Sequence, residues 1–364
     1  MTIVSHLKRL DWFLIGSVLF LSFVGLLEIY NICWHQGSFL NFEKQLIFIF
    51  LGLLLIFLFS SFDYRIFKTN SYLILSLYII TLILLIGLFF FGSEIKGVKG
   101  WYNFGLFSFD PVPFLSLILI IVLSKYFSRY HVEIYKFRHI FFSGIFVLIP
   151  SIIIFFQPDF GSVLMLVFIW IGIVIFSKIK ISHFLILLLI FGLTSLFLWG
   201  FALEDYQRQR IITFLNPEID KTGTSWNTNQ SKIAIGSGGL LGKGIGRGSQ
   251  AQYGFLPESQ TDFMFSAIAE ETGLIGVSVL LSALLFLIFK IIKIALISKN
   301  NFARLFASGF AFLLFSQVFI NISMSLGILP IIGIPLPFIS YGGSQLLVLY
   351  SGIGILQNIK IHSS

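Results

Sequence analysis

Ten long apolar runs are the feature of this sequence that most restricts how it can fold. A helix needs about 20 predominantly apolar residues to cross the hydrocarbon core of a membrane. The runs cover Trp12–Ile32, Gln45–Phe62, Ser71–Phe91, Pro113–Phe127, Ile140–Phe156, Gly161–Phe176, Ser182–Leu203, Asp262–Ala295, Phe302–Leu326 and Phe338–Ile359. Only 11% of the 364 residues are charged, whereas soluble domains contain about 25%. We therefore predict an all-α integral membrane protein, with about ten transmembrane helices in a single domain over residues 1–364.

Two of the runs have features of their own. Lys8 and Arg9 precede the first run, but no small-residue cleavage site follows it. We therefore expect a retained first span and not a signal peptide. The eighth run is unusually long, and its Gly273 and Gly276 predict a bend.

The basic residues fall mainly on one side of the predicted membrane. If the N-terminus is cytoplasmic, the cytoplasmic segments hold Lys8, Arg9, Arg65, Lys68, Lys125, Arg129, Lys136, Arg138, Lys178, Lys180, Lys290, Lys293, Lys299, Arg304 and Lys360. The short outer loops hold only Lys44, Lys96 and Lys99. This skew predicts that both termini are cytoplasmic. The net charge of +8 follows largely from it, so the charge gives no reason to expect nucleic-acid binding.

Residues 204–261, before the eighth run, form the one long loop that is predicted to be extracytoplasmic. The loop is polar and contains the glycine-rich stretch GSGGLLGKGIGRG (236–248). A loop of this length in a compact protein is usually functional or disordered. Apolar residues recur along it, which argues against plain disorder, and we expect short amphipathic pieces packed at the outer membrane face.

Four carboxylates lie where this loop enters the eighth run, in LPESQTDFMFSAIAEETG (256–273). Glu258 and Asp262 suit a helix amino end, where the macrodipole favours acidic side chains, with Thr261 as the cap. Asp262 also suits a general base at the outer membrane face. Glu270 and Glu271 lie two turns deeper, where carboxylates are costly and often functional. Alternatively, they hydrogen-bond to a neighbouring helix or to the loop.

Basic residues of the long loop have two interpretations each. Arg208 and Arg210, in YQRQRIITFLNPEID, either snorkel at the interface or bind phosphate oxygens bidentately. Lys232 and Lys243 lie in the glycine-rich NQSKIAIGSGGLLGKG. This stretch either is a flexible loop or forms an anion nest of backbone N–H groups.

Two proline-containing stretches interrupt the apolar pattern. Asp159, in QPDFG, suits a turn or helix cap better than a catalyst. LPIIGIPLPFISYGGSQ (329–345) places three prolines before the last run. Non-helical backbone at membrane depth is tolerated only where it is buried in protein or lines a cavity. We therefore predict a wedged or re-entrant segment whose polar end, with Ser340, Gly342 and Gly343, faces water.

Together, five of these motifs resemble the SEDS family (shape, elongation, division and sporulation) over nearly the whole chain. They are YQRQRIITFLNPEID, QSKIAIGSGGLLGKG, FLPESQTDFMFSAIAEETGLIG, QPDFG and GIPLPFISYGGS, and the first two are similar to the RodA branch. Asp262 matches the essential acidic position of the family, and Gln260 replaces the usual His two residues before it.

The resemblance implies a bacterial peptidoglycan glycosyltransferase of the cytoplasmic (inner) membrane. Such enzymes polymerise lipid II, an undecaprenyl-pyrophosphate-linked disaccharide–pentapeptide, into nascent glycan at the outer face of that membrane. The RodA branch serves lateral wall elongation and the maintenance of rod shape. It implies a class B penicillin-binding protein transpeptidase and other elongation-complex membrane proteins as partners.

The stretch KGWYNFGLFSFDPVPFLSL (99–117) departs from the family pattern. Pro113 and Ser116 stand where the family has Glu and Lys, and the family's Arg before the tryptophan is missing. Lys99 and Asp110 are candidates to compensate for these charges. The losses motivate one alternative function, a catalytically weakened scaffold for a penicillin-binding protein.

The main hypothesis is an inverting transfer in which Asp262 accepts the proton of the attacking sugar hydroxyl. The anionic pyrophosphate leaving group requires stabilisation, with or without a divalent Mg or Mn ion. The candidate substrate-binding residues are Arg208, Arg210, Lys232, Lys243, Glu258 and Lys99. A lipid II flippase is an alternative from the transport class, but its path should carry polar groups through the midplane. The second, third, sixth and seventh runs are nearly free of such groups.

Overall fold

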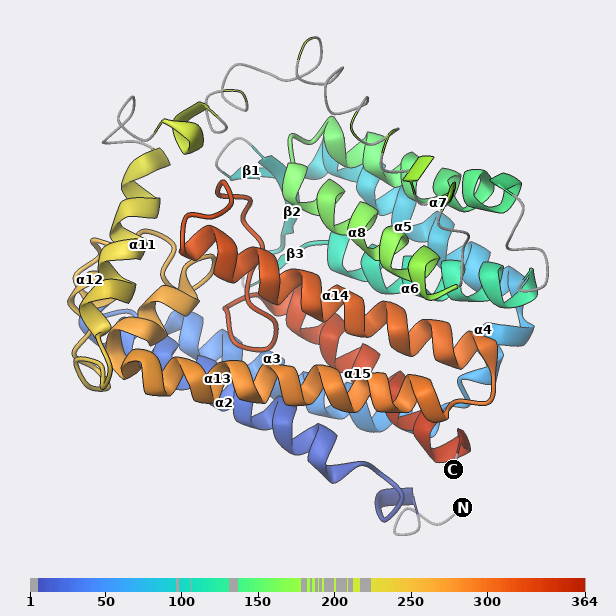
Figure 1. Ribbon diagram of the computed structural model, residues 1–364, viewed down its shortest axis with the longest axis horizontal. Helices are drawn as coiled ribbons and strands as arrows, with labels where there is room; N and C mark the ends of the chain where they lie inside the picture. Colours follow the sequence, from blue (N-terminus) through green and yellow to red (C-terminus); the bar gives the residue numbers. More distant parts are fainter. Residues whose placement is uncertain are drawn as a thin grey trace.

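Long helices packed side by side make up most of the protein (Figure 1). The computed structural model describes residues 6–95, 98–105, 107–130, 137–177, 182–183, 185–186, 189, 192, 200, 208, 212–216 and 224–363. The helices there are α2 (Trp12–Gln36), α3 (Leu40–Ser61), α4 (Arg65–Thr69), α5 (Ser71–Phe91), α6 (Val112–Arg129), α7 (Phe137–Phe155), α8 (Phe160–Phe176), α11 (Thr224–Gly238), α12 (Ser249–Gln252), α13 (Met264–Ile297), α14 (Asn301–Ser325) and α15 (Gly343–Ser363).

Nine of the ten predicted spans correspond to helices of the described residues. Seven of these helices are long and apolar enough to cross a membrane, and α8 is a shorter apolar helix. The predicted seventh span, Ser182–Leu203, lies almost entirely outside the described residues, as do Lys96 and Arg210. The prediction of an all-α protein with many membrane spans is confirmed.

A small antiparallel sheet between α5 and α6 is the part of the fold that we did not predict. Strands β1 (Ser93–Ile95), β2 (Val98–Asn103) and β3 (Ser108–Phe109) pair in that order. The hydroxyl of Tyr102 donates a hydrogen bond to the carbonyl of Leu84, at 2.6 Å, which holds the sheet against α5. Strands β1 and β3 have only three and two residues, and the sequence of β2, VKGWYN, does not alternate regularly between apolar and polar residues.

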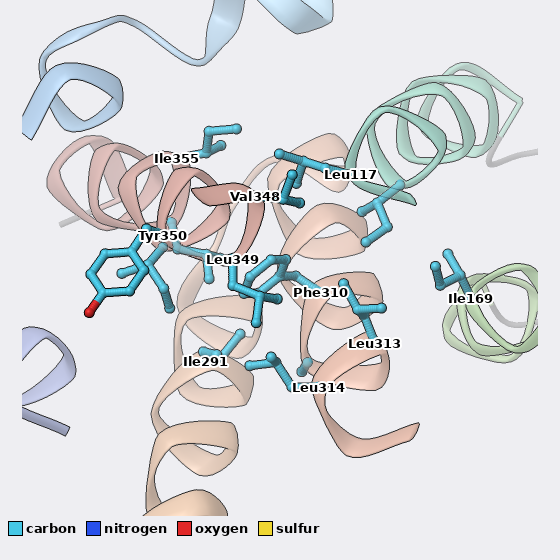
Figure 2. Close-up of a cluster of buried hydrophobic side chains, with 14 of the residues drawn as sticks. Leu117, Ile169, Ile291, Phe310, Leu313, Leu314, Val348, Leu349, Tyr350 and Ile355 are labelled. Carbon is cyan, nitrogen blue, oxygen red and sulfur yellow. The ribbon is translucent and has the colours of Figure 1, made fainter. Parts of the chain in front are cut away.

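Helix α14 lies in the centre of the bundle and contacts α6, α8, α13 and α15. Figure 2 shows the resulting core, in which side chains from five helices meet. The labelled residues are Leu117 of α6, Ile169 of α8, Ile291 of α13, Phe310, Leu313 and Leu314 of α14, and Val348, Leu349, Tyr350 and Ile355 of α15. Gly352 brings α15 close to α14, because a Cβ atom there would overlap the ring of Phe310.

The predicted bend in α13 is confirmed at Gly273, whose φ of 62° and ψ of −165° are non-helical. The glycine-rich loop satisfies the backbone groups that the bend frees. The N–H groups of Lys243 and Gly244 donate to the carbonyls of Glu270 and Glu271, both at 3.0 Å. In return, the N–H group of Leu274 donates to the carbonyl of residue 239 at 2.9 Å. The break at this buried position is therefore tolerated because another segment replaces the lost helical hydrogen bonds.

Candidate functional site

The segment between α14 and α15, residues 326–342, is non-helical, and its later part, residues 334–340, is mostly buried. We call it the wedge. Its Ile339 carbonyl lies against α2, where a Cβ atom at Gly25 would overlap it. The side chain of Gln45 on α3 donates to the carbonyl of Ser340 at 3.3 Å. The wedge thus fills the space between helices, which is where irregular backbone is tolerated in a membrane protein.

We predicted that the polar end of the wedge faces water. The structure shows that only part of it does. Ser340 is buried, with 5% of its surface exposed, and it points toward the protein. Gly342 is half-buried and precedes α15. Gly343 begins α15 and packs so closely on Phe48 that a Cβ atom would overlap its ring. Gly343 thus allows the start of α15 to lie close against α3.

Three consecutive carbonyl groups before α13 are held by hydrogen bonds from the wedge and α14. The carbonyl of Gln260 accepts from the N–H of Tyr341 at 2.8 Å. The carbonyl of Thr261 accepts from the Ser340 hydroxyl at 2.6 Å. The carbonyl of Asp262 accepts from the Asn321 side-chain amide at 2.9 Å. We call these three hydrogen bonds the clamp; they fix the backbone on which Asp262 stands.

The donors of the clamp are themselves held in place. Asn321 is fully buried, and its amide also donates to the carbonyl of Ile334 at 2.8 Å. The Ser340 hydroxyl accepts from the N–H of Leu336 at 3.0 Å. Two donors on α14 and the wedge therefore connect the wedge and the backbone at Asp262 into one unit.

Asp262 lies outside the helix and is half-buried. Helix α13 begins at Met264, and its N-cap, Phe263, makes no side-chain capping bond. The interpretation of Glu258 and Asp262 as first-turn helix carboxylates, capped by Thr261, is therefore wrong. The Thr261 hydroxyl donates instead to the carboxylate of Glu258, at 3.0 Å, and Glu258 is exposed.

The wedge also brings Asp262 into the neighbourhood of Asp159. A Cβ atom at Gly333 would lie 3.7 Å from Oδ2 of Asp262. The preceding residue of the wedge, Ile332, has its carbonyl against Gly161, which stands two residues after Asp159. Asp262 and Asp159 therefore flank adjacent residues of the wedge.

Asp159 and Asp110 each lie at the end of a loop, just before a helix. Asp159 caps α8, and its carboxylate accepts from the N–H of Ser162 at 3.1 Å. Asp110 accepts from the N–H of Val112 and donates its own N–H to the Ser344 hydroxyl, both at 2.9 Å. Burial raises the pKa of Asp159, and burial together with the charge of Asp159 raises the pKa of Asp110 to about 7. Asp110 therefore adds a carboxyl group beside Asp159.

The two positions that depart from the family pattern lie on α6, just after Asp110. Pro113 is half-buried in the first turn, and Ser116 is buried with its hydroxyl donating to the Val112 carbonyl at 3.1 Å. Lys99 is exposed on β2. In the described part of the chain, no contact places Lys99 beside Asp262.

The predicted cations differ in their surroundings. Lys232 lies on α11 with its Nζ close to the start of the wedge, since a Cβ atom at Gly327 would be 2.6 Å from it. Lys243 forms an ion pair with Glu270 at 2.6 Å. Arg208 donates to the carbonyl of Gly200 at 3.3 Å. Lys232 is thus the cation that the described contacts connect to the wedge.

The glycine-rich loop does bind anions, but they are carboxylates of the same chain. Glu270 accepts from Lys243, from the Ser249 hydroxyl at 3.1 Å and from the N–H of Gln250. The N–H of Gly246 donates to Glu271 at 2.9 Å. Both carboxylates are buried. These contacts favour internal anchoring for Glu270, Glu271 and Lys243, in place of an open nest for a ligand.

Sequence reasoning missed Asn321, although a signal was present. It is a side-chain amide in a predicted membrane span, in FINISMS, and intramembrane polar residues are often functional. Among the described residues, no group of three or more His, Cys, Asp or Glu side chains is arranged to hold a metal ion. We therefore derive no step through a metal.

Comparisons with known proteins agree with one another. A family model for FtsW, RodA and SpoVE, described as a cell cycle protein, matches residues 6–364. The peptidoglycan glycosyltransferase MrdB of Escherichia coli is 37% identical over 286 residues, which are 79% of this chain and 77% of MrdB. The stage V sporulation protein E of Bacillus subtilis is 33% identical over 363 residues and 97% of each chain.

Solved structures are similar over almost the whole length. A chain of a peptidoglycan synthase complex, studied for its coordination of polymerization and crosslinking, is 27% identical with a TM-score of 0.79, covering 97% of this chain and 98% of that one. The rod shape determining protein RodA of Thermus thermophilus is 28% identical with a TM-score of 0.69, covering 96% of each chain.

Proposed function

The chain belongs to the FtsW, RodA and SpoVE family of cell cycle proteins and is a peptidoglycan glycosyltransferase, and we propose that it polymerises lipid II with Asp262 as its general base. The observation that carries the proposal is the clamp at residues 260–262. The clamp holds the backbone of Asp262, a half-buried residue that lies outside the helix. A catalytic base must be kept within hydrogen-bonding reach of the proton that it abstracts.

In the proposed reaction, the hydroxyl of incoming lipid II attacks the anomeric carbon of the growing strand. Asp262 takes the hydroxyl proton while the new C–O bond forms. The bond from the anomeric carbon to the lipid pyrophosphate breaks, and its electron pair leaves with the pyrophosphate oxygen. A pyrophosphate leaves as an anion, so the reaction requires one base and no acid.

The leaving pyrophosphate requires positive charge beside it. We propose Lys232 as the main contributor, because its Nζ lies close to the wedge that borders Asp262. Arg208 and Arg210 remain candidates from the segment before α11. Lys243 is less suited, because a buried carboxylate already neutralises it.

We further propose that this chemistry takes place at the outer face of the bacterial inner membrane, beside a class B penicillin-binding protein. The positive-inside skew of the sequence supports an extracytoplasmic position for residues 204–261. The similarity to a chain of a complex that coordinates polymerization and crosslinking supports a crosslinking partner. A flippase would require a polar path through the bundle, whereas the centre of the bundle around α14 is an apolar core.

The test is polymerisation of lipid II by purified Asp262→Asn protein, with and without the partner, followed on gels. Removal of a general base should slow the reaction by roughly 10²–10⁴-fold. Glu94→Gln is the matched control, since it neutralises an exposed carboxylate on β1 that is not among the candidate substrate-binding residues, and it should remain active. Polymerisation by Asp262→Asn at a rate near that of the wild type would refute the assignment.

A further inference from the structure

A basic cavity of about 620 Å³ opens at the end of the bundle where α15 ends. Its wall includes Arg65 and Lys68 of α4, Lys299 and Asn301 at the turn between α13 and α14, and His362 of α15. Figure 1 shows α4 beside this turn. None of the described residues that line the cavity is acidic. The charge of the cavity is therefore positive and comes from two separate segments, α4 and the turn between α13 and α14.

Lys68 and Lys299 of the cavity differ from other basic residues at this end of the bundle, including Arg65, which lies 4.0 Å from the carboxylate of Asp63. Lys290 and Lys360 both form ion pairs with Asp11, at 3.1 and 2.7 Å. In the part of the chain that the structure describes, Lys68 and Lys299 have no carboxylate within 4.0 Å. Residual positive charge thus collects in the cavity, where an external anion can approach it.

The back of the cavity is rigid. Tyr64 is buried, and its N–H donates to the side-chain oxygen of Asn358 at 3.0 Å. Its ring stacks on Phe302 with centroids 6.3 Å apart. The amino end of α14, capped by Asn300, also faces the cavity, and helix amino ends favour anions. A preformed wall with a helix amino end suits a phosphate group.

Apolar side chains beside the cavity indicate which kind of phosphate it accepts. Phe62, two residues before Tyr64, is 56% exposed, and Ile66, which follows Arg65, is 44% exposed. Leu296, three residues before Lys299, is 78% exposed. A free phosphate ion makes no favourable contact with exposed apolar side chains, whereas the acyl chains of a lipid pack against them. We propose that the cavity binds the headgroup of an anionic phospholipid. Basic pockets between helices on the cytoplasmic side suit such headgroups.

The experiment compares lipid binding by the purified full-length protein and two triple variants. The cavity variant carries Arg65→Gln, Lys68→Gln and Lys299→Gln. The control variant carries Lys8→Gln, Arg9→Gln and Lys293→Gln, which remove the same charge from exposed residues outside the cavity. Native mass spectrometry and thermal melts in detergent are recorded with phosphatidylglycerol, cardiolipin, zwitterionic phosphatidylcholine or inorganic phosphate.

Anionic lipid should bind to and stabilise the wild type and the control, and bind the cavity variant roughly fivefold more weakly for each charge removed. Phosphatidylcholine should have little effect on any of the three. Equal binding of anionic lipid by the cavity variant and the control would overturn the proposal. Stabilisation by inorganic phosphate as large as that by anionic lipid would overturn it as well, since the site would then be one for a free anion. All the substituted side chains are exposed, so the variants should fold.

Discussion

Replacing Asn321 by alanine should slow glycosyl transfer by roughly 10- to 100-fold, and it should do so only through Asp262. The side chain donates to two buried carbonyls, those of Asp262 and Ile334. Each lost hydrogen bond costs about 1 kcal/mol net, or more where the acceptor remains buried. The protein should thus lose about 2 kcal/mol of stability and stay folded, while the backbone at Asp262 gains freedom. A displacement of about 1 Å can cost on the order of 10²-fold in rate.

A double-mutant cycle separates this effect from a general loss of structure. The rate of lipid II polymerisation and its KM are measured for Asn321→Ala, Asp262→Asn and the two combined. If Asn321 acts by positioning the base, kcat falls, KM changes little, and the double variant is no slower than Asp262→Asn. Residues that act as a unit are non-additive in this way.

Gln317→Ala provides the matched control for the cycle. Gln317 is a buried amide one turn earlier on α14, and its Oε1 has no hydrogen-bond partner among the described residues. Its loss should leave kcat near that of the wild type. If the fold loss of rate in the double variant equals the product of the two single losses, Asn321 does not act by positioning Asp262. If Asn321→Ala polymerises slowly while Asp262→Asn polymerises at a rate near that of the wild type, the assignment of Asp262 as the base is refuted.

Two further predictions test the surroundings of the site. Gly273→Ala should lower the thermal midpoint by several degrees, because φ is 62° and a Cβ atom would collide with the N–H of Gly242; such strain costs roughly 1–3 kcal/mol. Gly236→Ala is its control, since a Cβ atom there meets nothing within 4 Å. Thermal midpoints of both variants equal to that of the wild type would contradict the account of the bend. Asp110→Asn should raise the midpoint relative to wild type at pH 8 but not at pH 4. The pKa of this carboxyl is raised from 3.8 to about 7 in the folded protein, so the folded state binds the extra proton, and wild-type stability falls as pH rises through that window. A difference between variant and wild type that does not change with pH would contradict the raised pKa.

The helices were predictable because apolar length alone determines them. Helix α5 runs from Ser71 to Phe91, as the apolar run does. The last helix was placed wrongly: its run begins at Phe338, but α15 begins at Gly343. Phe338 and Ile339 extend the apolar run, yet the backbone of this stretch bonds to other segments, with the N–H of Tyr341 donating to the carbonyl of Gln260. Hydropathy does not report where a backbone hydrogen bond goes.

The glycine-rich loop shows the same limit for charged residues. Lys243 and the loop N–H groups were consistent with an anion site, and only the fold shows that the anions are Glu270 and Glu271. Those partners stand at least 20 residues away in the chain. The sequence contained both the cations and the carboxylates. Only the bend at Gly273, and the carbonyls that it frees, explains why they meet.

The clamp also suggests why the candidate base is held through its backbone. A hydrogen bond donated to a carboxylate stabilises its charged form, which makes the carboxylate a weaker base. Donors that grip the main-chain carbonyls restrict where the carboxylate can move without that penalty. At residues 260–262 the donors come from Tyr341, Ser340 and Asn321 and reach carbonyl oxygens. Position and basicity can therefore be set by different atoms, which is what general-base catalysis of a transfer to a pyrophosphate-activated sugar requires.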